Sequence, residues 1–275
     1  AIVQIHHGGA QALPELTPDG DVVAPSAISL KSFGQQEEHD AREMTAEEIE
    51  QTIRDFGEAT RRAIEAGFDG VEIHGANHYL IHQFVSPYYN RRNDVWADNY
   101  KFPVAVIDEV VKAKKAHAND DFIIGYRLSP EEAESPGISM EITEELIHQI
   151  ANKPLDYIHV SLMDVNSVTR EGKYKGENRL KLIHQWINGR MPLIGIGSVF
   201  TAEDALNAVE NIGVEFVALG REILLDYDFV AKIKEGREDE IINAFDPNRE
   251  DQHYLTPNLW EQFNQGFYPL PRKDK

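Results

Sequence analysis

The sequence contains no cysteine. This absence excludes disulfides, thiolate metal sites, iron–sulfur clusters and cysteine nucleophiles, and it suits a reducing compartment. No stretch approaches the roughly 20 apolar residues of a membrane helix. The first residues also lack the basic and then apolar form of a signal peptide. We therefore expect a cytoplasmic protein without a membrane partner, and we predict no metal site.

Basic residues are scarce as well. Lysine and arginine number 27 against 47 aspartates and glutamates, which gives a formal net charge of −20. Nucleic acids and anionic membranes bind basic faces, so neither is expected as a partner. The length of 275 residues and the 41% hydrophobic content suit one large α/β domain that binds a small molecule.

Short apolar runs alternate with amphipathic stretches along most of the chain. The runs are brief and apolar at consecutive positions, as in strands buried on both faces. The predicted strands are 2–5, 70–74, 122–127, 157–161, 193–197 and 216–220. The predicted helices are 45–66, 102–118, 143–152, 178–188, 202–211 and 258–265. Thr45 and Glu48 are spaced as a capping box at the start of the first helix.

This alternation predicts a parallel sheet and favours a (β/α)8 TIM barrel, which has eight strands. About six of the eight βα units are recognisable, and the chain begins inside a strand. We therefore expect that the first two units are missing, with an open sheet as the alternative. The barrel is predicted at 1–245 and a C-terminal extension that packs on it at 246–275. Residues 10–45 are predicted to form a long polar excursion over the barrel mouth.

Polar residues stand where the predicted strands end, which is where barrel enzymes place their reactive groups. One such stretch, residues 71–87, reads VEIHGANHYLIHQFVSP. It resembles the signature of the old yellow enzyme family of FMN-dependent ene-reductases, in particular the bacterial NADH-dependent flavin oxidoreductases. Four further motifs follow the family order over nearly the whole chain: Gln-x-x-His-x-Gly, Arg-Leu-Ser-Pro, Gly-Ser-Val and Leu-Gly-Arg-Glu. The resemblance implies FMN as cofactor, NADH or NADPH as reductant and small electron-poor alkenes as substrates.

The same resemblance implies the roles of three residues. His74 and Asn77 match the pair that donates hydrogen bonds to the substrate's carbonyl or nitro oxygen, and Tyr79 matches the proton donor. The alternative interpretations are a hydrogen-bonded histidine at a strand end, a helix cap and a core aromatic, respectively. His78 departs from the glycine that many relatives have at this position.

The resemblance also assigns residues to the cofactor. Gln4 and Arg127 match residues that contact the isoalloxazine ring, although Arg127 could instead form a salt bridge at the strand end. Two glycine turns match the phosphate end of the cofactor, where barrels use backbone N–H groups. Their residues are Gly197, Ser198, Gly220 and Arg221.

Three other hypotheses stay open at this stage. One is an FMN barrel of the dihydroorotate dehydrogenase type, which needs a serine or cysteine base. Another is a phosphate-binding isomerase or lyase, which needs a lysine or a carboxylate pair at the strand ends. The third is a truncated barrel fragment without catalytic activity. A homo-oligomer is possible under each of them.

Overall fold

The computed structural model describes residues 1–35, 37–253, 255–267 and 269–273. The chain forms two compact units, which are treated separately below. Unit 1 comprises Ala1–Ser161 and Val168–Leu193, and unit 2 comprises Leu162–Ser167 and Ile194–Lys275. Among the residues described, no helix is both long and apolar enough to cross a membrane.

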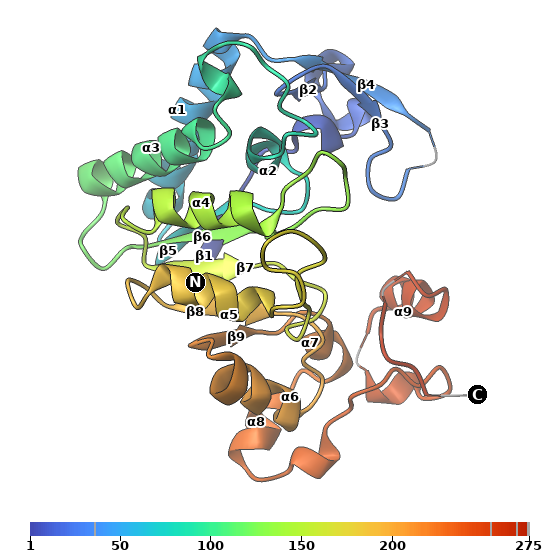
Figure 1. The fold of residues 1–275 in the computed structure, drawn as a ribbon. Coiled ribbons are helices and arrows are strands. Elements are labelled where there is room, and N and C mark those ends of the chain that lie inside the picture. The colour runs from blue at the N-terminus through green and yellow to red at the C-terminus, as the bar shows by residue number, and fades with distance from the viewer. Residues whose placement is uncertain (36, 254, 268, 274–275) are drawn as a thin grey trace. The chain divides into compact units, whose positions relative to one another are not determined.

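Unit 1 is built on a parallel sheet with the strand order β1-β5-β6-β7 (Figure 1). The strands are β1 (Ile2–Ile5), β5 (Gly70–Gly75), β6 (Ile123–Leu128) and β7 (Tyr157–Val160). Every residue of β5 is buried, as expected for a strand covered on both faces. All four strands were predicted from the sequence within two residues at each end.

Helices cover this sheet in unit 1. They are α1 (Ala46–Glu65), α2 (Leu80–Val85), α3 (Lys101–His117), α4 (Met140–Ile150) and α5 (Arg179–Ile187). The predicted capping box is confirmed, because Glu48 N–H donates to Thr45 Oγ1 at 3.2 Å and Thr45 N–H donates to Glu48 Oε2 at 2.8 Å. The helix α4 begins earlier than predicted because Ser139 caps it. The long helices α1 and α3 lie side by side (Figure 1).

The segment 10–45, predicted as a long polar excursion, contains regular structure that was not predicted. This segment contains a small sheet with the order β2-β4-β3, made of β2 (Val23–Ala24), β3 (Ile28–Leu30) and β4 (His39–Glu43). Its core is formed by small apolar side chains, namely Ala10, Val22, Ala24 and Ala41. The strands β2 and β3 are too short to show a periodic pattern, and β4 has a single buried residue, so no strand pattern is visible in this part of the sequence.

Unit 2 holds the paired parallel strands β8 (Leu193–Ile196) and β9 (Phe216–Ala218). Its helices are α6 (Ala202–Asn207), α7 (Arg221–Leu225), α8 (Phe229–Lys234) and α9 (Pro257–Asn264). The helix predicted at 202–211 is α6 followed by a π turn at Ala208–Ile212. The remaining helical turns among the described residues are 3-10: Gly9–Gln11, Pro14–Leu16, Pro18–Gly20, Val95–Ala97, Glu238–Glu240 and Glu250–Gln252.

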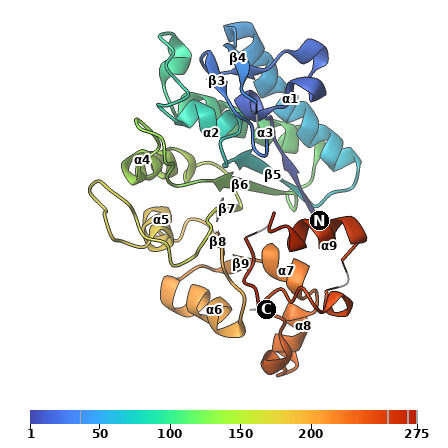
Figure 2. The same cartoon turned by 90° about the vertical axis from the view of Figure 1, so that its right-hand side faces the viewer.

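The C-terminal chain packs on α7 within unit 2 (Figure 2). Phe263 of α9 and Leu270 are buried in one apolar cluster with Leu225 and Phe245. These contacts attach α9 and Leu270 to the rest of unit 2 through a shared apolar core. The boundary between a barrel at 1–245 and an extension at 246–275 stays a prediction.

Candidate active site

The loop after β5 brings together the predicted catalytic residues of unit 1. Asn77 and His78 both adopt left-handed backbone conformations, with φ of 56° and 60°. This tight turn returns Tyr79 to His74, and their ring centroids lie 5.2 Å apart. His6, which follows β1, stacks on Tyr79 with centroids 5.0 Å apart and an interplanar angle of 19°. His74 and Tyr79 are therefore neighbours, and His6 is an additional aromatic partner that the sequence analysis did not assign.

The side-chain amide of Asn77 is held by two serines. Its Oδ1 accepts hydrogen bonds from Ser129 Oγ at 3.2 Å and Ser161 Oγ at 3.0 Å. Its Nδ2 donates to none of the described residues, so two N–H donors remain for a ligand. The helix cap of α2 is Tyr79, so the alternative interpretation of Asn77 as a helix cap is wrong.

His74 is buried and uncharged at neutral pH. Its residue is 3% exposed, and no hydrogen-bond partner for its buried Nδ1 occurs in the described chain. Burial first, and then the charges of Arg127 and His6, lower the pKa of His74 to about 4. A neutral imidazole carries one N–H and can donate it without adding a charge. The alternative of a fully hydrogen-bonded structural histidine is therefore wrong.

Arg127 on β6 is a half-buried cation that has no carboxylate partner among the described residues. It pairs in register with His74 on one side and His159 on the other. Its Nη2 donates to Ser161 Oγ at 3.0 Å, but its Nε is buried and finds no acceptor among the described residues. Burial lowers the pKa of Arg127, yet a guanidinium stays protonated at neutral pH. Arg127 therefore forms no salt bridge with a described residue, contrary to the alternative interpretation. Its unused Nε–H suits an anionic ligand.

Gln4 belongs to a polar network that the sequence analysis missed. Its Nε2 donates to Glu72 Oε1 at 2.5 Å. The other oxygen, Oε2, lies 2.9 Å from His159 Nδ1 and accepts from the Tyr157 hydroxyl at 3.1 Å. Gly125 stands between Glu72 and Tyr157 in register, and its missing side chain leaves room for the tyrosine ring. The amide N–H of Gln4 is thus engaged by Glu72, and its predicted contact with a flavin ring stays a prediction.

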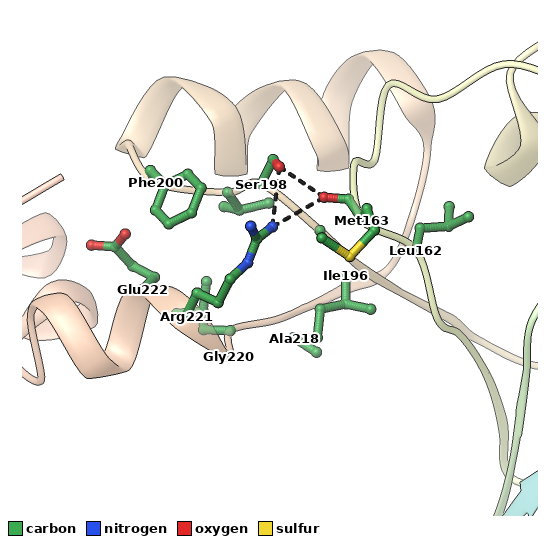
Figure 3. Close-up of a pocket in the computed structure, with 12 residues that line it drawn as sticks. Leu162, Met163, Ile196, Ser198, Phe200, Ala218, Gly220, Arg221 and Glu222 are labelled. Carbon is green, nitrogen blue, oxygen red and sulfur yellow. Dashed lines mark hydrogen bonds between the residues drawn. The ribbon is translucent and has the colours of Figure 1, made fainter. Parts of the chain in front are cut away.

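Unit 2 contains a small cavity between the two predicted glycine turns (Figure 3). Its volume is about 120 Å³, and Gly197, Ser198, Gly220 and Arg221 all line it. Pockets for whole drug-sized ligands measure roughly 300–1,000 Å³, so this one suits a compact group such as phosphate. Arg221 Nη2 donates to Ser198 Oγ at 3.2 Å and to the Met163 carbonyl at 3.1 Å. In the described chain Arg221 has only neutral acceptors, so its charge is available to an anion.

Gly197 is the more constrained of the two turn glycines. Its φ is 129°, and a Cβ would lie 2.6 Å from Asp164 N. We expect Gly197→Ala to lower the free energy of unfolding by about 1–3 kcal/mol because of backbone strain. Gly220→Ala is the matched control, since its nearest atom to an added Cβ is 3.8 Å away. Urea denaturation should show the larger loss at Gly197, and equal losses would contradict this explanation.

Glu222 lines the same cavity and is 2% exposed, with neither carboxyl oxygen hydrogen-bonded to a described residue. Burial, together with Asp226 and Asp204, raises its pKa to about 8. The folded chain therefore holds this proton more tightly than the unfolded chain. The stability it contributes is complete below about pH 4.5 and is lost as the pH rises through about 8.

We expect Glu222→Gln to remove the loss of folding stability at high pH because a neutral amide cannot ionise. At pH 9 the variant should be more stable than the wild type by about 3–5 kcal/mol, whereas at pH 5 the two should differ by about 1 kcal/mol or less. Thermal unfolding followed over this pH range measures the difference. A variant that loses stability with pH as the wild type does would show that another group is responsible.

The profile of the NADH:flavin oxidoreductase / NADH oxidase family, an FMN oxidoreductase family, matches residues 1–240. The chain belongs to this family. The resemblance stated from the sequence motifs is thereby confirmed, with FMN as the cofactor and a nicotinamide as the reductant. In unit 1 the buried, unused Nε–H of Arg127 suits an anionic group, and in unit 2 the cavity at the glycine turns suits a phosphate.

Two relatives illustrate the similarity. The chain is 48% identical over 275 residues to the probable NADH-dependent flavin oxidoreductase YqiG of Bacillus subtilis (strain 168), covering 98% of this chain and 72% of that protein. It is 39% identical over 270 residues to the NADH:fumarate oxidoreductase of Klebsiella pneumoniae (strain 342), covering 94% of this chain. The chain spans only 28% of the length of that second relative.

Solved structures show the same fold. The old yellow enzyme homologue from Zymomonas mobilis matches with a TM-score of 0.69 at 21% identity, over 94% of this chain and 71% of that one. The identity is too low to carry an argument about substrates.

Proposed function

We propose that the chain carries the active site of an ene-reductase, which uses NADH or NADPH and FMN to reduce C=C bonds activated by an adjacent electron-withdrawing group. The observation that supports it most is the set of unused donors in unit 1. Neutral His74 and the amide of Asn77 offer N–H groups beside the hydroxyl of Tyr79. The two N–H groups could hydrogen-bond a substrate's carbonyl oxygen, and the hydroxyl could give a proton to the carbon next to that carbonyl.

Each residue has a distinct part in the proposed reaction. FMN, when bound and reduced, supplies the hydride that adds to the β-carbon of the alkene. His74 and Asn77 hydrogen-bond the activating oxygen and stabilise the negative charge that develops there, and such donors act selectively on the transition state. Tyr79 transfers its hydroxyl proton to the α-carbon, a step that a phenol held within hydrogen-bond reach can perform toward an enolate. The product is the saturated compound.

We propose cofactor contacts within each unit, taken separately. In unit 1 the guanidinium of Arg127 would stabilise the anionic reduced ring, with Gln4 as a second ring contact. In unit 2 the phosphate would bind at Gly197, Ser198, Gly220 and Arg221. We also propose that the fold is the (β/α)8 barrel, to which this chain contributes six strands.

The relatives agree with an activated alkene as the substrate class. One of them is named an NADH:fumarate oxidoreductase, and fumarate is an alkene conjugated to two carboxyl groups. Enones present the same polarised C=C bond with a single oxygen to bind, so they are suitable first substrates for this site.

The test begins with colour. The purified chain is titrated with FMN, and binding is followed by the flavin absorbance near ~450 nm and by quenching of flavin fluorescence. We expect one FMN per chain, reduction by NADH, and reoxidation by 2-cyclohexenone under anaerobic conditions. Failure to bind FMN would support the alternative of a non-catalytic fragment. Binding without reoxidation by the enone would reject the proposed substrate class but keep the cofactor.

A further inference from the structure

Two histidines and a glutamate of unit 1 lie close together at the loop that follows β5. His78 lies in the loop after β5, His82 lies on α2, and Glu132 follows β6. Glu132 Oε2 is 2.7 Å from His82 Nε2 and 3.7 Å from His78 Nδ1. One potential ligand atom from each of the three lies within 4.8 Å of the other two. The two imidazole rings have centroids 4.6 Å apart.

The cluster is shielded from solvent and incompletely hydrogen-bonded. The side chains of His82 and Glu132 are 0% exposed and that of His78 is 25% exposed. In the part of the chain that is described, His78 Nδ1 has no hydrogen-bond partner although it is buried. Buried polar atoms are rarely left without a partner, so this nitrogen requires an explanation.

The arrangement of the three side chains suits a cation. Glu132 Oε1 accepts hydrogen bonds from Ser86 Oγ and from the Ile138 N–H, so Oε2 is the oxygen that faces the two imidazoles. Imidazole nitrogens and carboxylate oxygens are metal donors in their unprotonated forms.

We propose that His78, His82 and Glu132 bind a divalent transition-metal ion of the zinc class. Imidazole and carboxylate ligands suit such ions, and two histidines with one glutamate make a known three-ligand set for zinc. The carboxyl group of Glu134 is the candidate for the fourth position, because its Oε2 is buried without a partner among the described residues and its charge acts on His78.

The geometry needs little adjustment. Bonds of about 2.0–2.1 Å in a tetrahedron place neighbouring ligand atoms about 3.3 Å apart. The separation of 3.7 Å between His78 Nδ1 and Glu132 Oε2 is close to this value. The 2.7 Å contact between His82 and Glu132 must widen slightly as the ion replaces the shared proton. The bound ion would join the loop after β5 to the loop after β6, next to Tyr79.

The backbone supplies a clean variant for the test. Because φ at His78 is 60°, glycine fits this position without strain, and His78→Gly removes one ligand while keeping the fold. The exposed His148 on α4 provides the control variant His148→Ala. All proteins are freed of any polyhistidine tag and stripped with a chelator before use.

Each protein is titrated with Zn²⁺ by calorimetry and with Co²⁺ by visible absorption, without FMN or NADH. We expect one ion per chain for the wild type and for His148→Ala, and an affinity lowered by at least about 100-fold in His78→Gly. Zn²⁺ should raise the Tm of the first two proteins and not that of the third. A wild type that binds no ion, or a His78→Gly variant that binds as the wild type does, overturns the proposal. Neither readout depends on the proposed enzymatic activity.

Discussion

Replacing His74 by alanine is expected to slow alkene reduction by about 10²- to 10³-fold, the usual loss when one preorganised donor to a developing oxyanion is removed. His74 is buried in unit 1 and its pKa is lowered to about 4, so it acts as a neutral donor. The measurement is the single-turnover reoxidation of NADH-reduced enzyme by 2-cyclohexenone. FMN binding, read from flavin absorbance, should remain.

Two comparisons decide whether the effect comes from the hydrogen bond. His74→Asn keeps an N–H donor and should recover part of the lost rate. The wild-type rate should also show no inflection from His74 between pH 5 and 9, because this group titrates near pH 4. If His74→Ala reoxidises as fast as the wild type, the residue does not bind the activating oxygen.

Replacing Tyr79 by phenylalanine is expected to slow the same half-reaction by about 10²-fold or more, since positioned proton donors contribute roughly 10²–10⁴. The phenylalanine ring preserves the stacking with His6 at 5.0 Å and the contact with His74. Reduction of the enzyme by NADH should be unchanged because it involves no proton transfer to carbon. Stopped-flow absorbance resolves the two half-reactions.

Tyr88→Phe is the matched control for this experiment. Tyr88 is a partly buried tyrosine near the same loop whose ring contacts Tyr89, and we assign it no part in catalysis. Its variant should keep both rates. Slowing of both half-reactions to the same extent in Tyr79→Phe would refute the role of proton donor.

The six strands of the parallel type and most of the helices could be predicted because their signals are local. Apolar runs such as that of β5 reflect burial on both faces, and the spacing of Thr45 and Glu48 reflects one helix end. The small sheet at 10–45 could not be predicted in the same way. Its strands are two to five residues long, and they form because they pair with each other. Their own residues show no apolar run that would indicate a strand.

The site residues were found through motifs, but their partners were not. Nothing in the order of residues shows that Glu72 engages Gln4 and His159, since these come from three different strands. The same holds for Glu132, which is separated by 50 positions from its hydrogen-bond partner His82. The pairs around Glu72 depend on strand register, and the His82–Glu132 pair depends on how α2 packs against the loop after β6. A single sequence reveals neither.

The two serine hydroxyls that grip the oxygen of Asn77 have a thermodynamic consequence for ligand affinity. A surface amide rotates among several orientations, and a ligand that fixes it loses about 0.5–1.5 kcal/mol of binding free energy to lost rotamer freedom. Here that entropy is already lost when the chain folds. A ligand oxygen that binds Asn77 therefore causes no further loss of side-chain entropy. The free energy of each hydrogen bond contributes more fully to the binding affinity.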